Sequence, residues 1–259
     1  MKSPWIDRSL IEMAEQLRKA VDKLILLDFD GTLVDFTAFA ADALPSKDLL
    51  NLLQKISSIT DNQLIIITGR KNSEIDRLVG QLPVDIIAEH GAMIRENYVW
   101  RTLLDSNTGW KKEVFPVIRK YSTISPNSFI EEKFYSLAWH YRNVDHFTGE
   151  TNSRELIKVL RKISVRHNLR IMDGNKVVEI ISSNINKGAA VRYLLTKKNY
   201  DYILAIGDDE TDEDMFRILL NNKNAFTVKI GQGTTSAKYK LNSNQQVLML
   251  LEQLVTETG

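Results

Sequence analysis

With 259 residues, the chain is long enough for one large domain or two small ones with a buried core. A formal net charge of +1 gives no electrostatic argument for nucleic acid or an anionic membrane as a partner, and the lack of cysteine excludes disulfides and thiolate chemistry. No apolar run approaches the roughly 20 residues of a membrane span, and the N-terminal residues do not form a secretory signal. We therefore expect a soluble, cytoplasmic protein.

The first part of the chain alternates between helix and strand patterns. Apolar residues at helical spacing predict amphipathic helices, and short runs of branched apolar residues predict buried strands. In chain order these are a helix over 9–21, a strand over 24–27, a helix over 47–59, a strand over 63–67 and a strand over 85–88. Strands that alternate with helices predict a parallel sheet with right-handed crossovers.

Residues 92–181 follow a different pattern, which indicates antiparallel strands with helices. Residues 131–142 are predicted to form one long strand, and Asp173-Gly174-Asn175 predicts a hairpin turn. Pro116 predicts a kink or a break in the helical pattern over 110–121. We expect this block to be a separate α+β domain inserted into the first.

The alternation of helix and strand returns after the insert. The expected elements are a helix over 187–195, a strand over 202–206, a helix that begins near Thr211, a strand over 226–230 and a helix that Ser243 opens. The predicted fold class is therefore α/β. Residues 1–91 and 182–259 would form a Rossmann-like core with a parallel sheet, and residues 92–181 would form the insert.

Polar residues follow four of the predicted strands at the point where each strand ends. They are Asp28 and Asp30, Thr68, Glu89 and His90, and Asp208 and Asp209. The carboxyl ends of parallel strands lie along one edge of a sheet, where open α/β sheets bind their ligands, so these groups can converge. Two carboxylates at the end of a buried strand are costly to place there without a cation.

The acidic run from Asp208 to Asp214 allows two interpretations. Acids are favoured at a helix N-terminus by a few tenths to about 1 kcal/mol each, which accounts for Asp212, Glu213 and Asp214. That effect does not account for Asp208 and Asp209, which directly follow a buried strand and a glycine. A divalent ion would relieve the repulsion between these acids, and oxygen-only ligands suit Mg²⁺.

Lys187 and Thr68 each have an ordinary interpretation beside the functional one. A lone lysine at this place most often lies solvated at the start of a helix, and a threonine at a strand end often has a hydroxyl with no functional role. Beside clustered carboxylates and a phosphate, the Lys187 ammonium would balance charge and orient a nucleophile. Thr68, directly before Gly69, would hold an anionic oxygen.

Four motifs occur in order along the chain: Asp28-Phe29-Asp30-Gly31-Thr32, then Thr68, then Lys187, then Gly207-Asp208-Asp209. Together they resemble the motifs of the haloacid-dehalogenase-like phosphohydrolases. By this resemblance, Asp28 attacks phosphorus to form an aspartyl-phosphate, and Asp30 protonates the leaving oxygen and then activates water. The resemblance also implies that Mg²⁺ binds Asp28, the backbone carbonyl of Asp30, and Asp208, and that the insert is an α+β cap domain.

The insert and the fourth motif carry a narrower resemblance, over residues 125–133, 138–142, 177–179, 186–190, 207–216 and 231–237. These segments are similar to those of the trehalose-6-phosphate phosphatases. The similarity implies Mg²⁺-dependent hydrolysis of trehalose 6-phosphate to trehalose and phosphate in trehalose biosynthesis. Glu131, Lys133 and Glu179 would then hold the sugar hydroxyls, since charged groups make strong hydrogen bonds to polyols.

Each candidate in the insert also has a structural interpretation. Glu131 and Lys133 could form an exposed strand pair, which would contribute almost nothing to stability. Period-two alternation places both on the face of Leu137, so a bulge near Phe134 would be needed to aim them at substrate. Asn127 stands where the family commonly has glycine, and asparagine tolerates the positive φ of such a turn.

Three further residues are candidates for substrate binding. Arg70 would contact phosphate or sugar, or it would cap the helix that follows. His140 and Arg142 would reach the sugar, although such residues are more often structural.

Two alternatives to this function remain. One is the same chemistry on sucrose phosphate or glucosylglycerol phosphate. The other is a non-catalytic regulatory domain of a trehalose synthase complex, which would be expected to lose an acid of the first or fourth motif. A trehalose-6-phosphate synthase domain or partner is the candidate macromolecular partner, and the dispersed, balanced charges argue against nucleic acid.

Overall fold

The structure is a computed structural model that describes residues 13, 15–17, 19–35, 37, 42–59, 61–104 and 107–255. The chain divides into two compact units, one of Met1–Leu103 with Asn186–Gly259 and one of Leu104–Ile185. We call them the core unit and the inserted unit. Within the described ranges, none of the helices combines the length and apolar character that a membrane-spanning segment requires.

The core unit contains an eight-stranded sheet in the order β12-β11-β10-β1-β2-β3-β4-β5. From β12 to β3 neighbouring strands run parallel, and β4 and β5 complete one edge in antiparallel orientation. The strands are β1 Lys23–Asp28, β2 Asn62–Ile67, β3 Asp85–Ala88, β4 Met93–Glu96, β5 Val99–Thr102, β10 Tyr202–Gly207, β11 Ala225–Ile230 and β12 Tyr239–Leu241. This confirms the predicted α/β class.

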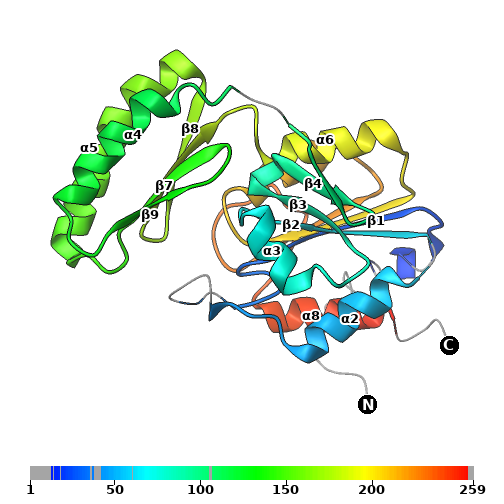
Figure 1. The fold of residues 1–259 in the computed structure, drawn as a ribbon. Coiled ribbons are helices and arrows are strands. Elements are labelled where there is room, and N and C mark those ends of the chain that lie inside the picture. The colour runs from blue at the N-terminus through cyan, green and yellow to red at the C-terminus, as the bar shows by residue number, and fades with distance from the viewer. Residues whose placement is uncertain are drawn as a thin grey trace. The chain divides into compact units, whose positions relative to one another are not determined.

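Helices cover both faces of this sheet (Figure 1). They are α2 Lys47–Ser57, α3 Asn72–Val79, α6 Lys187–Lys197, α7 Asp212–Leu219 and α8 Asn244–Gln253. Successive side chains of a strand point to opposite faces, so Ile25 and Leu27 of β1 pack with α2, α3 and α8, while Leu24 and Leu26 pack with α6 and α7. Burial on both faces explains why β1 is apolar throughout.

The helix expected over 9–21 lies partly outside the described residues. Those that are described there, 13, 15–17 and 19, are helical. Met13 and Leu17 are buried in the apolar cluster that includes α2 and α8. The apolar spacing that predicted this helix therefore marks its buried face.

The inserted unit contains a four-stranded antiparallel sheet in the order β6-β7-β9-β8. Its elements are α4 Lys111–Thr123, β6 Phe129–Glu132, β7 Ser136–His140, α5 His146–His167, β8 Leu169–Gly174 and β9 Val177–Ser182. Both helices pack on the sheet face that carries Leu137 and Trp139 (Figure 1). The hairpin between β8 and β9 is confirmed, while Pro116 does not break α4.

The single strand predicted over 131–142 is wrong, because the chain forms a hairpin there. β6 ends at Glu132 and β7 begins at Ser136. Glu131 pairs with Ala138, and opposite residues in an antiparallel pair share a face. Glu131 therefore lies on the face opposite the helices, and a chain reversal rather than a bulge near Phe134 moves it off the face of Leu137.

The start of the insert also differs from the expected residue 92. The strands β4 and β5 extend the core sheet beside β3, and the compact inserted unit begins after Leu103. Asn97 and Tyr98 connect these strands with φ of 49° and 64°. Two residues with positive φ match the right-handed twist of a tight hairpin, but tyrosine is an uncommon residue for that conformation.

Candidate active site

The polar groups predicted at strand ends lie on neighbouring strands of the core sheet. Asp28 is the last residue of β1, Thr68 follows β2 and Asp208 follows β10. Because β1 pairs in parallel with both β2 and β10, the carboxyl ends of these strands meet at one edge. That edge is the candidate site.

Lys187 is the first residue of α6, and its side chain lies buried between two carboxylates. Its Nζ donates to Oδ1 of Asp28 at 2.7 Å and to Oδ1 of Asp212 at 2.8 Å. Gly188 lets α6 approach α7 this closely, because a Cβ there would lie 2.4 Å from the carbonyl oxygen of Asp214. Lys187 is only 1% exposed, so the solvated helix start is excluded.

The acidic run divides differently from the expectation. Asp209, not Asp212, holds the start of α7, because its Oδ1 accepts hydrogen bonds from the backbone N–H groups of Thr211 and Asp212 at 2.7 and 3.1 Å. Asp212 instead accepts from Lys187 and, through Oδ2, from the N–H groups of Asp208 and Asp209 at 2.9 and 3.1 Å. The sequence interpretation missed Asp212 as a site residue.

Three carboxylates at this edge form a group that could hold a metal ion, which we call the aspartate cluster. Asp28, Asp208 and Asp212 each offer an oxygen, and these atoms lie within 4.8 Å of one another. Thr32 donates its hydroxyl to Oδ1 of Asp208 at 3.2 Å. Hard oxygen donors fit Mg²⁺, whereas soft metals prefer sulfur ligands. The donor set therefore fits the cation that the sequence predicted.

The electrostatics of the aspartate cluster favour a bound cation. Burial raises the pKa of Asp28 to about 8, with repulsion from Asp208 and Asp209 adding to it against the attraction of Lys187. Burial likewise raises the pKa of Asp208 to about 7, together with repulsion from Asp212 and Asp209. Burial alone would lower the pKa of Lys187, but attraction to Asp212 and Asp28 outweighs it and raises that pKa. One ammonium therefore does not neutralise the cluster.

Mg²⁺ is expected to raise the melting temperature more at about pH 8 than at about pH 6. In the folded, metal-free protein Asp28 and Asp208 have pKa values of about 8 and about 7, above their ordinary value of 3.8. Protons on these two groups therefore stabilise the fold. This contribution is complete below pH 3.8 and is lost as the pH rises through about 7 to about 8. A divalent ion replaces these protons, so it competes with them at low pH.

Thermal melts with Mg²⁺ and with a chelator at both pH values measure the difference. The variant Asp28→Asn lacks one of the two groups that bind these protons. The Mg²⁺-induced shift of its melting temperature should therefore differ less between the two pH values. Equal shifts of the wild-type melting temperature at both pH values would contradict the electrostatic argument.

Asp30 and Arg70 form a bidentate ion pair next to the aspartate cluster. The Nε of Arg70 donates to Oδ2 of Asp30 at 2.8 Å, and one terminal nitrogen donates to Oδ1 at 2.5 Å. The guanidinium lies 5.2 Å from the ring centroid of Phe29. A guanidinium fork that matches a carboxylate in this way restricts its orientation. Arg70 thus contacts Asp30, an arrangement that the sequence did not predict.

The loop that carries Thr68 is held by the turn after β3. In that turn, η2 (Glu89–Gly91), the N–H of His90 donates to the carbonyl of Thr68 at 3.0 Å and the N–H of Glu89 donates to that of Arg70 at 2.9 Å. Glu89 and His90 both have positive φ, 49° and 57°. Such backbone conformations cost energy and persist only where surrounding contacts impose them. Glu89 and His90 therefore position the Thr68 loop through their backbone.

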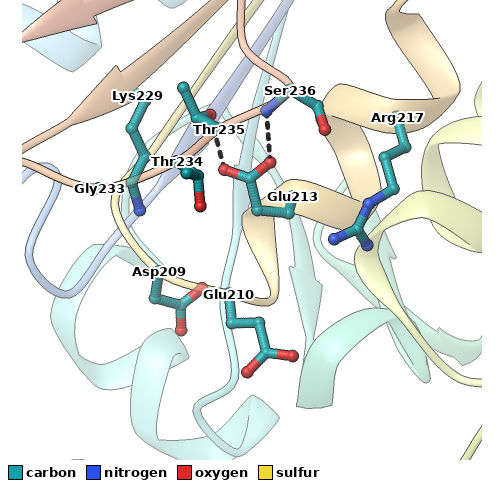
Figure 2. Close-up of a pocket in the computed structure, with 9 residues that line it drawn as sticks. All are labelled: Asp209, Glu210, Glu213, Arg217, Lys229, Gly233, Thr234, Thr235 and Ser236. Carbon is teal, nitrogen blue, oxygen red and sulfur yellow. Dashed lines mark hydrogen bonds between the residues drawn. The ribbon is translucent and has the colours of Figure 1, made fainter.

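A pocket of about 520 Å³ opens in the core unit beside the acidic run (Figure 2). Its lining residues are Asp209, Glu210, Glu213, Arg217, Lys229, Gly233, Thr234, Thr235 and Ser236. Glu213 accepts from the hydroxyl of Thr235 at 2.6 Å and from the N–H of Ser236 at 2.8 Å. These two bonds fasten the 231–237 loop to α7.

In the inserted unit, the sheet face opposite the helices is polar. Lys133 Nζ donates to Oε1 of Glu179 at 3.1 Å, and the hydroxyl of Ser136 donates to the same oxygen at 2.5 Å. Glu131 and His140 are joined by a hydrogen bond of 2.9 Å. Four candidates from the sequence thus lie on or beside one face, and the structure adds Ser136, for which the sequence offered no signal.

Arg142 and Asn127 have other places in the inserted unit. Arg142 is exposed and donates to the carbonyl of Asn175 at 2.8 Å, so its contact is with the turn between β8 and β9. Asn127 has a φ of 68°, which confirms the positive φ expected for that turn.

Comparisons with known proteins identify the family. The family model for trehalose-phosphatase matches residues 26–245. A bifunctional trehalose-6-phosphate synthase/phosphatase of Thermoproteus tenax is 35% identical, and the alignment covers 95% of this chain and 34% of the relative's length. A trehalose-phosphatase of Zygosaccharomyces rouxii is 33% identical, and the alignment covers 95% of this chain and 32% of the relative's length. This chain thus spans about a third of the length of these curated relatives.

The fold agrees with a solved structure of the same kind. The C-terminal domain of trehalose-6-phosphate phosphatase from Candida albicans superposes with a TM-score of 0.88 at 29% identity, covering 98% of each chain. The chain therefore belongs to the trehalose-phosphatase family of haloacid-dehalogenase-like hydrolases.

Proposed function

We propose that this protein hydrolyses trehalose 6-phosphate to trehalose and phosphate in trehalose biosynthesis, with Mg²⁺ as cofactor. The observation that carries the proposal is the buried Asp28 carboxylate, which lies at the end of β1, pairs with Lys187 and belongs to the aspartate cluster. An anionic nucleophile beside an ammonium and a cation site is suited to attack on a phosphate dianion. Family membership supports the substrate class.

In the first step, an oxygen of Asp28 forms a bond to phosphorus while the bond from phosphorus to the sugar oxygen breaks. Asp30 gives its proton to that leaving oxygen, which becomes a hydroxyl of trehalose. The Asp28 carboxylate now carries the phosphoryl group as a mixed anhydride. Arg70 orients the Asp30 carboxylate through its bidentate contact, and it would have to release one carboxyl oxygen before Asp30 carries the proton.

In the second step, Asp30 takes a proton from water, and the resulting hydroxide attacks phosphorus. The bond between phosphorus and the Asp28 oxygen breaks, which releases phosphate and restores the carboxylate. Thr68 would hold a phosphoryl oxygen at the end of β2, and Lys187 would keep Asp28 oriented and balance its charge. Mg²⁺, held by Asp28, Asp208 and the carbonyl of Asp30, would supply charge neutralisation for the transferring group.

The polar face of the inserted unit supports the sugar specificity. Glu131, Lys133 and Glu179 would bind sugar hydroxyls, and His140 would share this task through its contact with Glu131. Phe129 stacks on His140 with ring centroids 4.5 Å apart, which limits the orientations of that imidazole. A sugar that lacks one of the matching hydroxyls forms fewer hydrogen bonds with these charged groups, so such a site discriminates between sugars.

The deciding experiment compares phosphate release from trehalose 6-phosphate, sucrose phosphate and glucosylglycerol phosphate, with Mg²⁺ and with a chelator. We expect trehalose 6-phosphate to be preferred and the chelator to abolish turnover. A preference of more than tenfold for another sugar phosphate would refute the trehalose assignment. No metal-dependent release from any of them would favour the regulatory domain, which the complete set of Asp28, Asp30, Lys187 and Asp208 argues against.

Neighbouring glutamates supply a matched control for the sugar site. Glu131 lies on the polar face, whereas Glu132 pairs with Leu137, has a side chain that is 58% exposed and forms an ion pair with Lys111. Glu131→Gln should raise KM for trehalose 6-phosphate and leave hydrolysis of p-nitrophenyl phosphate unchanged, while Glu132→Gln should change neither.

A trehalose-6-phosphate synthase is the partner that we propose. The name of the T. tenax relative combines synthase and phosphatase, and this chain matches 34% of that protein. Such a partner would supply the sugar phosphate on which the proposed reaction depends. Co-purification of the two activities tests it.

A further inference from the structure

Lys229 holds the backbone of Asp208 from the neighbouring strand. It lies in β11 opposite Gly207, the last residue of β10, and it is only 7% exposed. Its Nζ donates to the backbone carbonyl oxygen of Asp208. Figure 2 shows the Lys229 side chain extending from its strand toward the side of the pocket on which Asp209 lies. A buried ammonium thus binds the backbone of Asp208, the first residue of the acidic run.

The peptide groups on both sides of the Asp208 side chain are therefore fixed. The N–H of Asp208 donates to Oδ2 of Asp212 at 2.9 Å, and its carbonyl accepts from Lys229. Between these two anchors the carboxylate projects toward Asp28 and Asp212, within the 4.8 Å of the aspartate cluster. Residue 208 lies beyond the end of β10 and before α7, so neither element's regular hydrogen bonds fix it.

We propose that Lys229 is a positioning residue for the metal site, because it orients the Asp208 carboxylate for a divalent cation. Outer contacts of this kind typically change metal affinity by about 10-fold to 100-fold when they are removed. The inference rests on the proposed function only through the assignment of Asp208 as a metal ligand.

The direction in which metal affinity changes distinguishes a positioning role of Lys229 from a purely electrostatic effect of its charge. An ammonium near a cation site repels the cation, so loss of its charge alone would tighten metal binding. Loss of its hydrogen bond to Asp208 would loosen the ligand and weaken binding. The two explanations therefore predict opposite changes for the substitution Lys229→Met.

The chain offers a matched control on the adjacent strand. Lys240 of β12 is the register partner of Lys229, and its Nζ donates to the carbonyl of Gly233 at 2.7 Å. Lys240→Met removes the same charge and the same kind of bond, but from a carbonyl outside the aspartate cluster. Lys229→Arg keeps both the charge and the donor.

The experiment titrates each protein with Mn²⁺ and follows the free ion by electron paramagnetic resonance, so it needs no turnover. We expect Lys229→Met to weaken Mn²⁺ binding by about 10-fold or more, Lys229→Arg to recover most of it, and Lys240→Met to match wild type. Unchanged or tighter binding in Lys229→Met overturns the proposal. If that variant does not fold, Lys229→Gln, which is shorter and uncharged, is titrated under the same criterion.

The outcome also separates this inference from the proposed function. A wild-type protein that binds no Mn²⁺ would refute the metal site itself and, with it, the metal-dependent mechanism. Wild-type binding with unchanged affinity in Lys229→Met would refute only the role of Lys229.

Discussion

Replacing Asp28 with asparagine is expected to lower the turnover of trehalose 6-phosphate by about 10⁴-fold or more. Loss of a catalytic nucleophile has effects of this order, because the remaining groups cannot form the covalent intermediate. The amide oxygen can still accept the hydrogen bond from Lys187, so the site keeps its packing. Since burial raises the pKa of Asp28 to about 8, the neutral amide should leave the metal-free protein as stable as wild type at about pH 8, or more stable.

Steady-state phosphate release measures the loss of activity, and rapid-quench mass spectrometry shows whether the wild-type chain carries a phosphoryl group during turnover. Asp201→Asn is a matched control, because Asp201 is exposed directly before β10 and its carboxylate accepts a hydrogen bond from the backbone N–H of Asp22. It should keep full activity. Metal-dependent release by Asp28→Asn at a wild-type rate would disprove the nucleophile assignment.

The strand ends of the core could be predicted from the sequence because their signals are local. A run of branched apolar residues such as Leu24 to Leu27 needs burial on both faces, which only the interior of a covered sheet provides. Parallel neighbours then bring the residues after each strand to one edge. Asp28, Thr68 and Asp208 follow this rule, because Asp28 is the last residue of β1, Thr68 directly follows β2 and Asp208 directly follows β10.

Side-chain partners within the site could not be predicted in the same way. The pairing of Arg70 with Asp30 joins residues 40 positions apart, and that of Lys187 with Asp212 depends on how closely α6 and α7 pack. Asp212 looked like an ordinary acid at a helix start, because the electrostatic preference for acids there does not distinguish residues that face the site. Its bonds to the N–H groups of Asp208 and Asp209 become visible only in three dimensions.

Chain reversals without the usual turn residues caused the two errors in the fold. Residues 133–135 contain neither glycine, proline nor asparagine, so nothing in Lys133-Phe134-Tyr135 indicated that one strand would become two. The turn at Asn97 and Tyr98 has the asparagine of the usual Asn-Gly pair but a tyrosine in place of the glycine. The first error mattered for function, because an uninterrupted alternation put Glu131 on the wrong face of the sheet.

Replacing Lys187 with methionine is expected to lower both activity and stability. Methionine has a similar volume but no charge, so it leaves Asp28 and Asp212 buried without their ammonium. Removal of one partner from a buried ion pair typically costs about 3–5 kcal/mol. Turnover should fall by about 10³-fold or more, because Asp28 loses the group that orients it and favours its ionised form.

The stability loss should itself depend on pH and metal. Without Lys187, the carboxylates hold protons to still higher pH, so the metal-free variant should be destabilised more at about pH 8 than at about pH 6. Urea unfolding with a chelator at both pH values measures this, and saturating Mg²⁺ should recover part of the loss by supplying the missing positive charge.

The surface provides the control for this substitution. Lys158 forms an ion pair with Glu155 in which the two side chains are 67% and 52% exposed, so Lys158→Met should change the unfolding free energy by less than about 1 kcal/mol. If Lys187→Met behaved like Lys158→Met, the lysine would not be balancing the charge of the aspartate cluster. The two lysines differ in burial. Water solvates the charges of Lys158 and Glu155 at the surface, whereas the buried charges of Asp28 and Asp212 depend on Lys187 and the metal for compensation.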